Sequence, residues 1–332
     1  MSLGFPRDPA KVRSTGEVRY TVLFVDFPGA PATRTPESMF SAVSPQSEAY
    51  FRSVSYGKMT LVYKPELRWL RMSQPASAYV FSTFAGHRSY IQEAVTLAGS
   101  SVDYSRTDAL LVLADPSTVG LSTAGPALGA NLGDGVNAGG RMLANGVTSG
   151  RDLATWGALW ASHEIGHNLG LPDLYASSAP GHRYVGMYSL MGLISGPGRE
   201  FFAWERWNLD WIDDSQVWCA TTTGTTEVPL TPVSQSGGLK MVVVPITATS
   251  AIVVESRRAE GYDSGFASGA LAYVVDVSLR TQQGPIRVLP LDEADQSKSS
   301  AILTAGRSLS HAGVTVSVVS STGSTDTVRI VR

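Results

Sequence analysis

Apolar positions divide the chain into two regions that differ in periodicity. In the first region, up to about residue 215, nearly continuous apolar runs at residues 18–27 and 108–114 predict buried strands, and the alternation over 59–72 predicts one or two more. Helical periodicity predicts four helices, at residues 36–56, 87–98, 152–169 and 199–211. The intervening stretch 121–140 is rich in Gly and Ala, and we predict a loop there.

The second region begins after residue 215, where short β-branched segments recur between turn residues. We predict strands at residues 240–246, 251–255, 270–277, 314–319 and 327–331. Such spacing is typical of an antiparallel β-sandwich. The chain is therefore expected to be α+β, with a mixed-sheet domain over residues 1–215 and a β-rich domain over residues 216–332. Because the junction carries Trp211, Ile212 and Trp218, we expect the second domain to pack on the first.

The amino-acid composition argues against several classes of binding partner and metal site. Apolar residues make up 43% of the 332 positions, which is enough for a sizeable core. Lys and Arg number 26 against 28 Asp and Glu, a net charge of −2, so neither nucleic acid nor a membrane is expected as a partner. The single cysteine, Cys219, excludes an internal disulfide and a cysteine-cluster metal site. Charged residues are scarce at 16%, and we expect a secreted protein whose leader is not part of this sequence.

One sequence motif predicts a catalytic metal site. Residues 163–173 read HEIGHNLGLPD and fall in the helix predicted for 152–169. His163 and His167 are four positions apart, so both imidazoles project from one helix face and can bind the same metal ion, most commonly zinc. Glu164 lies roughly 100° around the helix, where it can accept a proton from a water molecule that the metal activates.

Two histidines leave the metal short of a third protein ligand. Gly170 is placed to end the helix in a left-handed turn, and Pro172 prevents its resumption. Asp173 follows at once, and we predict that it supplies the third ligand. The alternative is a glutamate from the next helix, either Glu200 or Glu205. If it is not a ligand, Glu205 would be an exposed charge beside Arg206.

These motifs resemble the immune inhibitor A family of secreted bacterial zinc metallopeptidases. HEIGHNLGLPDLY at residues 163–175 resembles that family's zinc-binding helix and turn. YSLMG at 188–192 is similar to the methionine turn of metzincin-like enzymes, and FFAWERWNLDWI at 201–212 to the family's next helix. The resemblance implies a metzincin-like catalytic domain over residues 1–215, with Met191 beneath the metal. It makes three tyrosines candidates to stabilise an oxyanion: Tyr175, Tyr184 and Tyr188.

We therefore predict a zinc-dependent endopeptidase that holds one Zn²⁺ and hydrolyses protein or peptide substrates with Glu164 as general base. Two other classes stay open. One is a binding module that has the protease fold without activity, and the other is a different zinc hydrolase, such as an amidase or a glycan-modifying enzyme. Scattered carboxylates such as Asp134 and Asp263 give no support for a calcium site.

Overall fold

The computed structural model describes residues 1–332, and its contacts divide the chain into two compact units. The sheet–helix unit consists of Asp8–Ser53 and Gly57–Gly170. The sandwich unit consists of Met1–Arg7, Val54–Tyr56 and Leu171–Arg332. Helices and several β-sheets occur together, so the predicted α+β class is confirmed.

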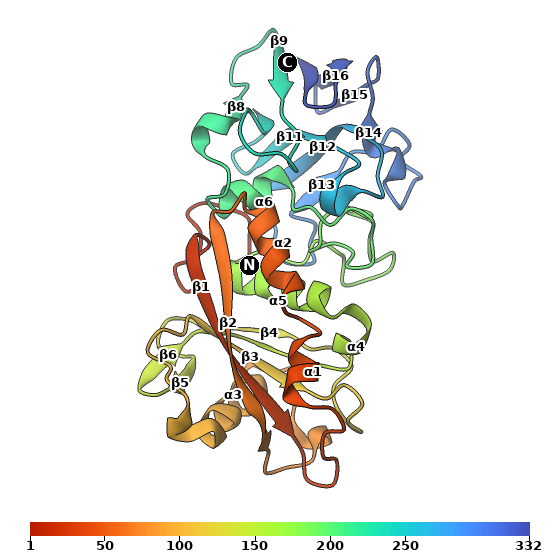
Figure 1. Ribbon diagram of the computed structural model, residues 1–332. Helices are drawn as coiled ribbons and strands as arrows, with labels where there is room; N and C mark the ends of the chain where they lie inside the picture. Colours follow the sequence, from red (N-terminus) through yellow and green to blue (C-terminus); the bar gives the residue numbers. More distant parts are fainter. The chain divides into compact units, whose positions relative to one another are not determined.

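A five-stranded sheet organises the sheet–helix unit (Figure 1). Its order is β2-β1-β3-β7-β4, and the first four strands are parallel while the edge strand β4 is antiparallel. The strands are β1 (Gly16–Asp26), β2 (Met59–Arg71), β3 (Ala109–Ala114), β7 (Asn145–Thr148) and β4 (Ala127–Gly129). All six residues of β3 are buried, as its unbroken apolar run predicts for a central parallel strand. A hairpin of β5 (Val136–Ala138) and β6 (Arg141–Leu143) completes the unit's strands.

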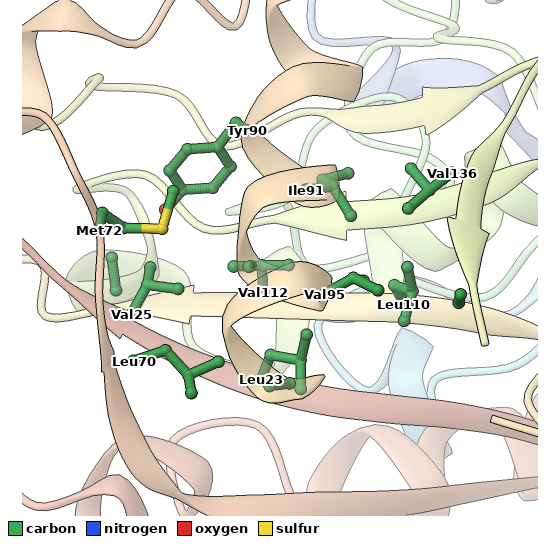
Figure 2. Close-up of a cluster of buried hydrophobic side chains, with 14 of the residues drawn as sticks. Leu23, Val25, Leu70, Met72, Tyr90, Ile91, Val95, Leu110, Val112 and Val136 are labelled. Carbon is green, nitrogen blue, oxygen red and sulfur yellow. The ribbon is translucent and has the colours of Figure 1, made fainter. Parts of the chain in front are cut away.

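Helix α3 (Phe84–Ala98) covers one face of this sheet. Figure 2 shows Tyr90, Ile91 and Val95 of the helix turned toward Leu23, Val25, Leu110 and Val112 of the strands. The period of two along β1 explains the pairing, because odd-numbered residues from 23 face α3 while Tyr20 faces the other side and meets helix α5 (Ala158–Leu169). Burial of each large side chain in such a core contributes about 1.5–3 kcal/mol.

Two predicted helices are each interrupted. The segment 36–56 forms α1 (Pro36–Phe40) and α2 (Gln46–Val54), because Pro45 has no backbone N–H to continue a helix. The segment 152–169 forms α4 (Leu153–Trp156) and α5, because Gly157 between them has φ of +48°. The predicted loop at 121–140 was wrong in part, since it contains β4 and β5, whose three-residue length gives no readable periodicity.

The sandwich unit contains two sheets that share one apolar core. The first has the order β13-β12-β11-β10-β8, with β14 also paired to β12, and the second has the order β15-β16-β17-β9. Their strands are β8 (Val217–Cys219), β9 (Thr225–Leu230), β10 (Met241–Pro245), β11 (Ser250–Arg257), β12 (Gly269–Asp276), β13 (Ile286–Val288), β14 (Ile302–Leu303), β15 (Ser308–His311), β16 (Val314–Ser321) and β17 (Asp326–Val331). The pairing is antiparallel, as predicted, except that β8 runs parallel to β10.

The division between the units differs from the boundary predicted near residue 215. Residues 171–215 group with the β region, because helix α6 (Ala203–Asn208) is buried against its first sheet. Ala203 N–H donates to Glu255 Oε2 at 2.6 Å, and Trp204 N–H donates to Tyr273 Oη at 3.3 Å. The apolar residues of this helix indicate that it is buried, but periodicity alone does not say against which element. None of the helices combines the length and the apolar character that a membrane span requires.

Candidate metal centre

Helix α5 brings the two motif histidines together inside the sheet–helix unit. His163 and His167 lie one turn apart, and their ring centroids are 4.8 Å apart with the planes nearly perpendicular at 88°. Both are buried, at 4% and 9% exposure. The imidazole side chain is a common metal ligand, and two of them on one face of a helix can present nitrogens to the same ion.

Glu164 completes the cluster. It is partly exposed, and the ligand atoms of His163, Glu164 and His167 all lie within 4.8 Å of one another. Imidazole nitrogens are preferred zinc ligands, whereas a neighbouring carboxylate that stays accessible can exchange protons with water. The three side chains therefore form a donor set that could hold a metal ion.

The helix ends where the sequence predicted. Gly170 adopts the left-handed conformation with φ of 109°, and its N–H bonds to the carbonyls of Gly166 and His167. Only glycine takes this conformation without strain, so the end of the motif helix is fixed by residue type. The chain enters the sandwich unit at Leu171.

Two side chains hold α5 against the rest of its unit by directional bonds. Trp160 Nε1 donates to the carbonyl of Gly125 at 2.8 Å. Near the other end of the helix, the Asn168 amide donates to the carbonyl of Leu128 at 3.0 Å and accepts from Tyr20 Oη at 3.1 Å. Asn168 is not among the residues predicted for the site, although a polar residue at a position that helical periodicity buries is a signal that could have identified it.

Asp173 lies in the sandwich unit, where a loop fixes its carboxylate and backbone. Its Oδ2 accepts from Thr281 Oγ1 at 3.1 Å, and its N–H donates to the same hydroxyl at 3.0 Å. Gln282 N–H donates to the Asp173 carbonyl at 3.0 Å. The residue as a whole is partly exposed, but its Oδ1 atom is buried. That Asp173 binds the metal with the two histidines stays a prediction.

The YSLMG segment forms a tight turn. Ser189 has φ of +66°, which is strained for a residue other than glycine, and its hydroxyl accepts the N–H of Met191 at 3.2 Å. The same hydroxyl donates to Glu205 Oε2 at 2.9 Å. The Met191 carbonyl accepts the N–H of Leu174 at 3.0 Å. Glu205 thus supports a turn that is hydrogen-bonded to the residue after Asp173.

Both glutamates considered as alternative ligands are buried in the sandwich unit. Glu205 is fully buried, and its Oε2 also accepts the N–H of Phe202 at 2.8 Å. Burial raises the pKa of Glu205 to about 7. The expectation that Glu205 is a surface charge beside Arg206 is wrong, because Arg206 is itself buried and forms its ion pair with Glu200.

Tyr188 and Asp263 are both buried, and each has structural partners. Tyr188 is fully buried and stacked on Phe266, with ring centroids 4.3 Å apart, and burial raises the pKa of its hydroxyl. A side chain in that position has no access to substrate, which leaves Tyr175 and Tyr184 as oxyanion candidates. Asp263 is buried and paired with Arg257 Nη1 at 2.6 Å, so its carboxylate serves an ion pair.

Comparisons with known proteins give no family assignment. No family model matches the chain, and no curated protein matches it. Two crystal structures of wild-type OgpA from Akkermansia muciniphila are similar at 12% and 11% identity. The alignments cover 90% and 91% of this chain and 87% and 90% of those chains, with TM-scores of 0.33 and 0.35. Such low scores carry no argument about function, and the resemblance to the immune inhibitor A family stays an expectation from the motifs.

Proposed function

We propose that this chain is a zinc-dependent endopeptidase of metzincin-like type. One observation carries the proposal: two buried imidazoles and a partly exposed carboxylate within one helical turn, with ligand atoms within 4.8 Å of one another. His163 and His167 would hold the ion, and Glu164 would serve as general base. The substrate would be a protein or peptide.

The chain's own groups suffice to move the proton. A bound zinc ion supplies Lewis acidity, which lowers the pKa of water to about 7 and polarises the scissile carbonyl. Glu164 accepts a proton from the attacking water as the new C–O bond forms. The same carboxyl then donates that proton to the amide nitrogen as the C–N bond breaks, so the amine leaves neutral and Glu164 returns to its ionised form.

Asp173 remains our proposal for the third ligand. In its favour, it follows the Gly170 turn by three residues and is partly exposed. Glu205 and Glu200 are both fully or almost fully buried, the first bonded to Ser189 and the second to Arg206. Removing either glutamate from its partner would leave a buried polar group unpaired, at a cost of about 1–3 kcal/mol or more.

The test compares Glu164→Gln with the parent for zinc content and for cleavage of casein. The amide preserves the shape of the side chain but cannot accept the proton, so we expect unchanged zinc and a loss of about 10²–10⁴-fold in rate. Glu37→Gln makes the same change at an exposed position of α1 and should leave both properties unchanged. Equal cleavage by Glu164→Gln and the parent would contradict the role of Glu164.

The same assay separates the competing functions. A parent chain that takes up no zinc at neutral pH would refute the metal site itself. Zinc uptake without cleavage of any protein substrate would favour the inactive binding module. Zinc uptake with hydrolysis of simple amides or glycans, but not of casein, would favour a different zinc hydrolase.

A further inference from the structure

Asn168 follows His167 directly, and all of its side-chain polar atoms are bonded within the sheet–helix unit. The residue is fully buried. Its Nδ2 donates to the carbonyl of Leu128 at 3.0 Å and to the carbonyl of Gly146 at 3.3 Å. Its Oδ1 accepts from Tyr20 Oη at 3.1 Å. The amide therefore contacts three strands, β4, β7 and β1.

The partners allow only one orientation of the amide. Leu128 and Gly146 are opposite each other in the β4–β7 pair, and both offer carbonyl oxygens that can only accept. Rotation of the amide by 180° would place Oδ1 against those two oxygens. The backbone carbonyl of Asn168 accepts the N–H of Val12 at 3.0 Å, which adds a fourth bond at the same residue. The last turn of α5 is thus bound at a defined rotation about its axis.

This rotation determines where the two imidazoles point. A group about 5–6 Å from a helix axis moves by roughly 1 Å when the helix turns by about 10°. Metal–ligand distances tolerate deviations of only about 0.2 Å. The burial of Ile165 and Leu169 is not directional in itself, so it defines this rotation less sharply than the hydrogen bonds of Trp160 and Asn168 do.

We propose that Asn168 is a positioning residue that sets the rotation of α5 and thereby the aim of His163 and His167 at the metal. The inference rests on the proposed zinc site. An asparagine suits the task because it offers two donors and one acceptor without charge in a site that excludes water. Neither aspartate nor leucine offers that combination at similar size.

The experiment measures metal affinity and ligand geometry separately from stability. Asn168→Leu removes all three side-chain bonds, and Tyr20→Phe removes only the bond to Oδ1. Asn145→Leu is the matched control, because Asn145 is also a buried asparagine of this unit, on β7, and its Nδ2 donates to the carbonyl of Ala10 at 2.7 Å. For each variant, urea unfolding of the metal-free chain gives stability, zinc competition against a chromophoric chelator gives affinity, and the visible absorption of bound Co²⁺ reports the ligand geometry.

We expect Asn168→Leu to weaken zinc binding by about 10–100-fold and to shift the Co²⁺ bands, as loss of a group that orients metal ligands does. Tyr20→Phe should change the zinc affinity and the Co²⁺ bands in the same direction, by smaller amounts. Asn145→Leu should lose stability while its zinc affinity and Co²⁺ spectrum stay those of the parent.

Parental affinity and spectrum in a folded Asn168→Leu would overturn the inference, as would equal weakening in Asn145→Leu. If Asn168→Leu does not fold, Tyr20→Phe decides, and parental affinity in that variant overturns the inference. A parent chain that binds neither Zn²⁺ nor Co²⁺ would refute the proposed function itself and the inference with it. The two failures are distinguishable because only the second removes binding from the parent.

Discussion

At the scale of single residues, the sandwich unit contains a carboxyl group whose ionisation opposes folding. Glu205 is fully buried beside Ser189 and Phe202, and burial raises its pKa from 4.5 to about 7. Arg257 lowers this pKa and Glu255 raises it, both by smaller amounts. Below pH 4.5 the group is protonated in both the folded and unfolded chain and costs nothing. As the pH rises to 7, the unfolded chain ionises first, so stability is lost across this window.

Glu205→Gln should therefore gain stability relative to the parent as the pH rises from about 4.5 to 7. A shift of one pKa unit corresponds to about 1.4 kcal/mol. The gain in the free energy of unfolding therefore reaches roughly 3 kcal/mol near pH 7 and then levels off. Urea unfolding followed by tryptophan fluorescence across this pH range measures it, and the difference between the two chains cancels the other titrating groups. A flat difference for Glu205→Gln would contradict the shifted pKa.

The residues of the candidate metal centre and the buried polar residues around it differ in how far the sequence reveals them. The clustering of His163, Glu164 and His167 could be predicted from their spacing, because a helix brings such positions within one turn of each other. Asn168 and Ser189 form hydrogen bonds to partners more than ten positions away in the chain, so the sequence does not reveal those partners, although a polar residue at a buried position could have drawn attention to Asn168. The sequence predicts Glu205 as a ligand or a surface charge and gives no sign of its buried hydrogen bond to Ser189.

At the scale of elements, the break between α4 and α5 depends on one glycine. Gly157 has φ of +48° and ψ of −122°, and an added Cβ would lie 2.9 Å from the carbonyl oxygen of Ala42. Gly157→Ala should thus destabilise the chain by roughly 2–3 kcal/mol, through backbone strain and this contact. Gly140→Ala is the control, because Gly140 has φ of +85° with open space around it and should lose about 1 kcal/mol. Thermal unfolding of both variants decides, and equal losses would exclude a role for the contact.

Elements were predicted best where one periodicity extends over many residues. The segments that became β1, β3, α3 and β11 were assigned correctly because long apolar runs or long helical stripes identify them. The sequence does not reveal the three-residue strands β4 and β5, because their pairing is decided by β7 and β6 rather than by their own residues. Edge strands of this length are determined by tertiary contacts, which a single sequence does not display.

At the scale of the whole molecule, the sandwich unit is assembled from three separate chain segments. Tyr56 Oη donates to the carbonyl of Val233 at 2.7 Å, and its ring lies 5.1 Å from the Arg206 guanidinium. Trp204 Nε1 donates to the carbonyl of Leu3 at 3.0 Å. The boundary predicted near residue 215 would cut through this assembly. The sequence pattern changes there from helical to β-branched segments, but the residues on both sides of that point belong to the same unit.

Limited digestion with subtilisin should therefore release no stable fragment that begins near residue 215–220. Trp211 and Ile212 are buried just before that point, and β8 directly after it is hydrogen-bonded to β10, so neither side of the junction is a free linker. Residues 171–215 and 216–332 should stay associated after any nick, because α6 donates hydrogen bonds to Glu255 and Tyr273 across it. Native mass spectrometry of the digest checks this. Accumulation of a separate, folded 216–332 fragment would show that the β strands form a core without α6 and would restore the boundary predicted from the sequence.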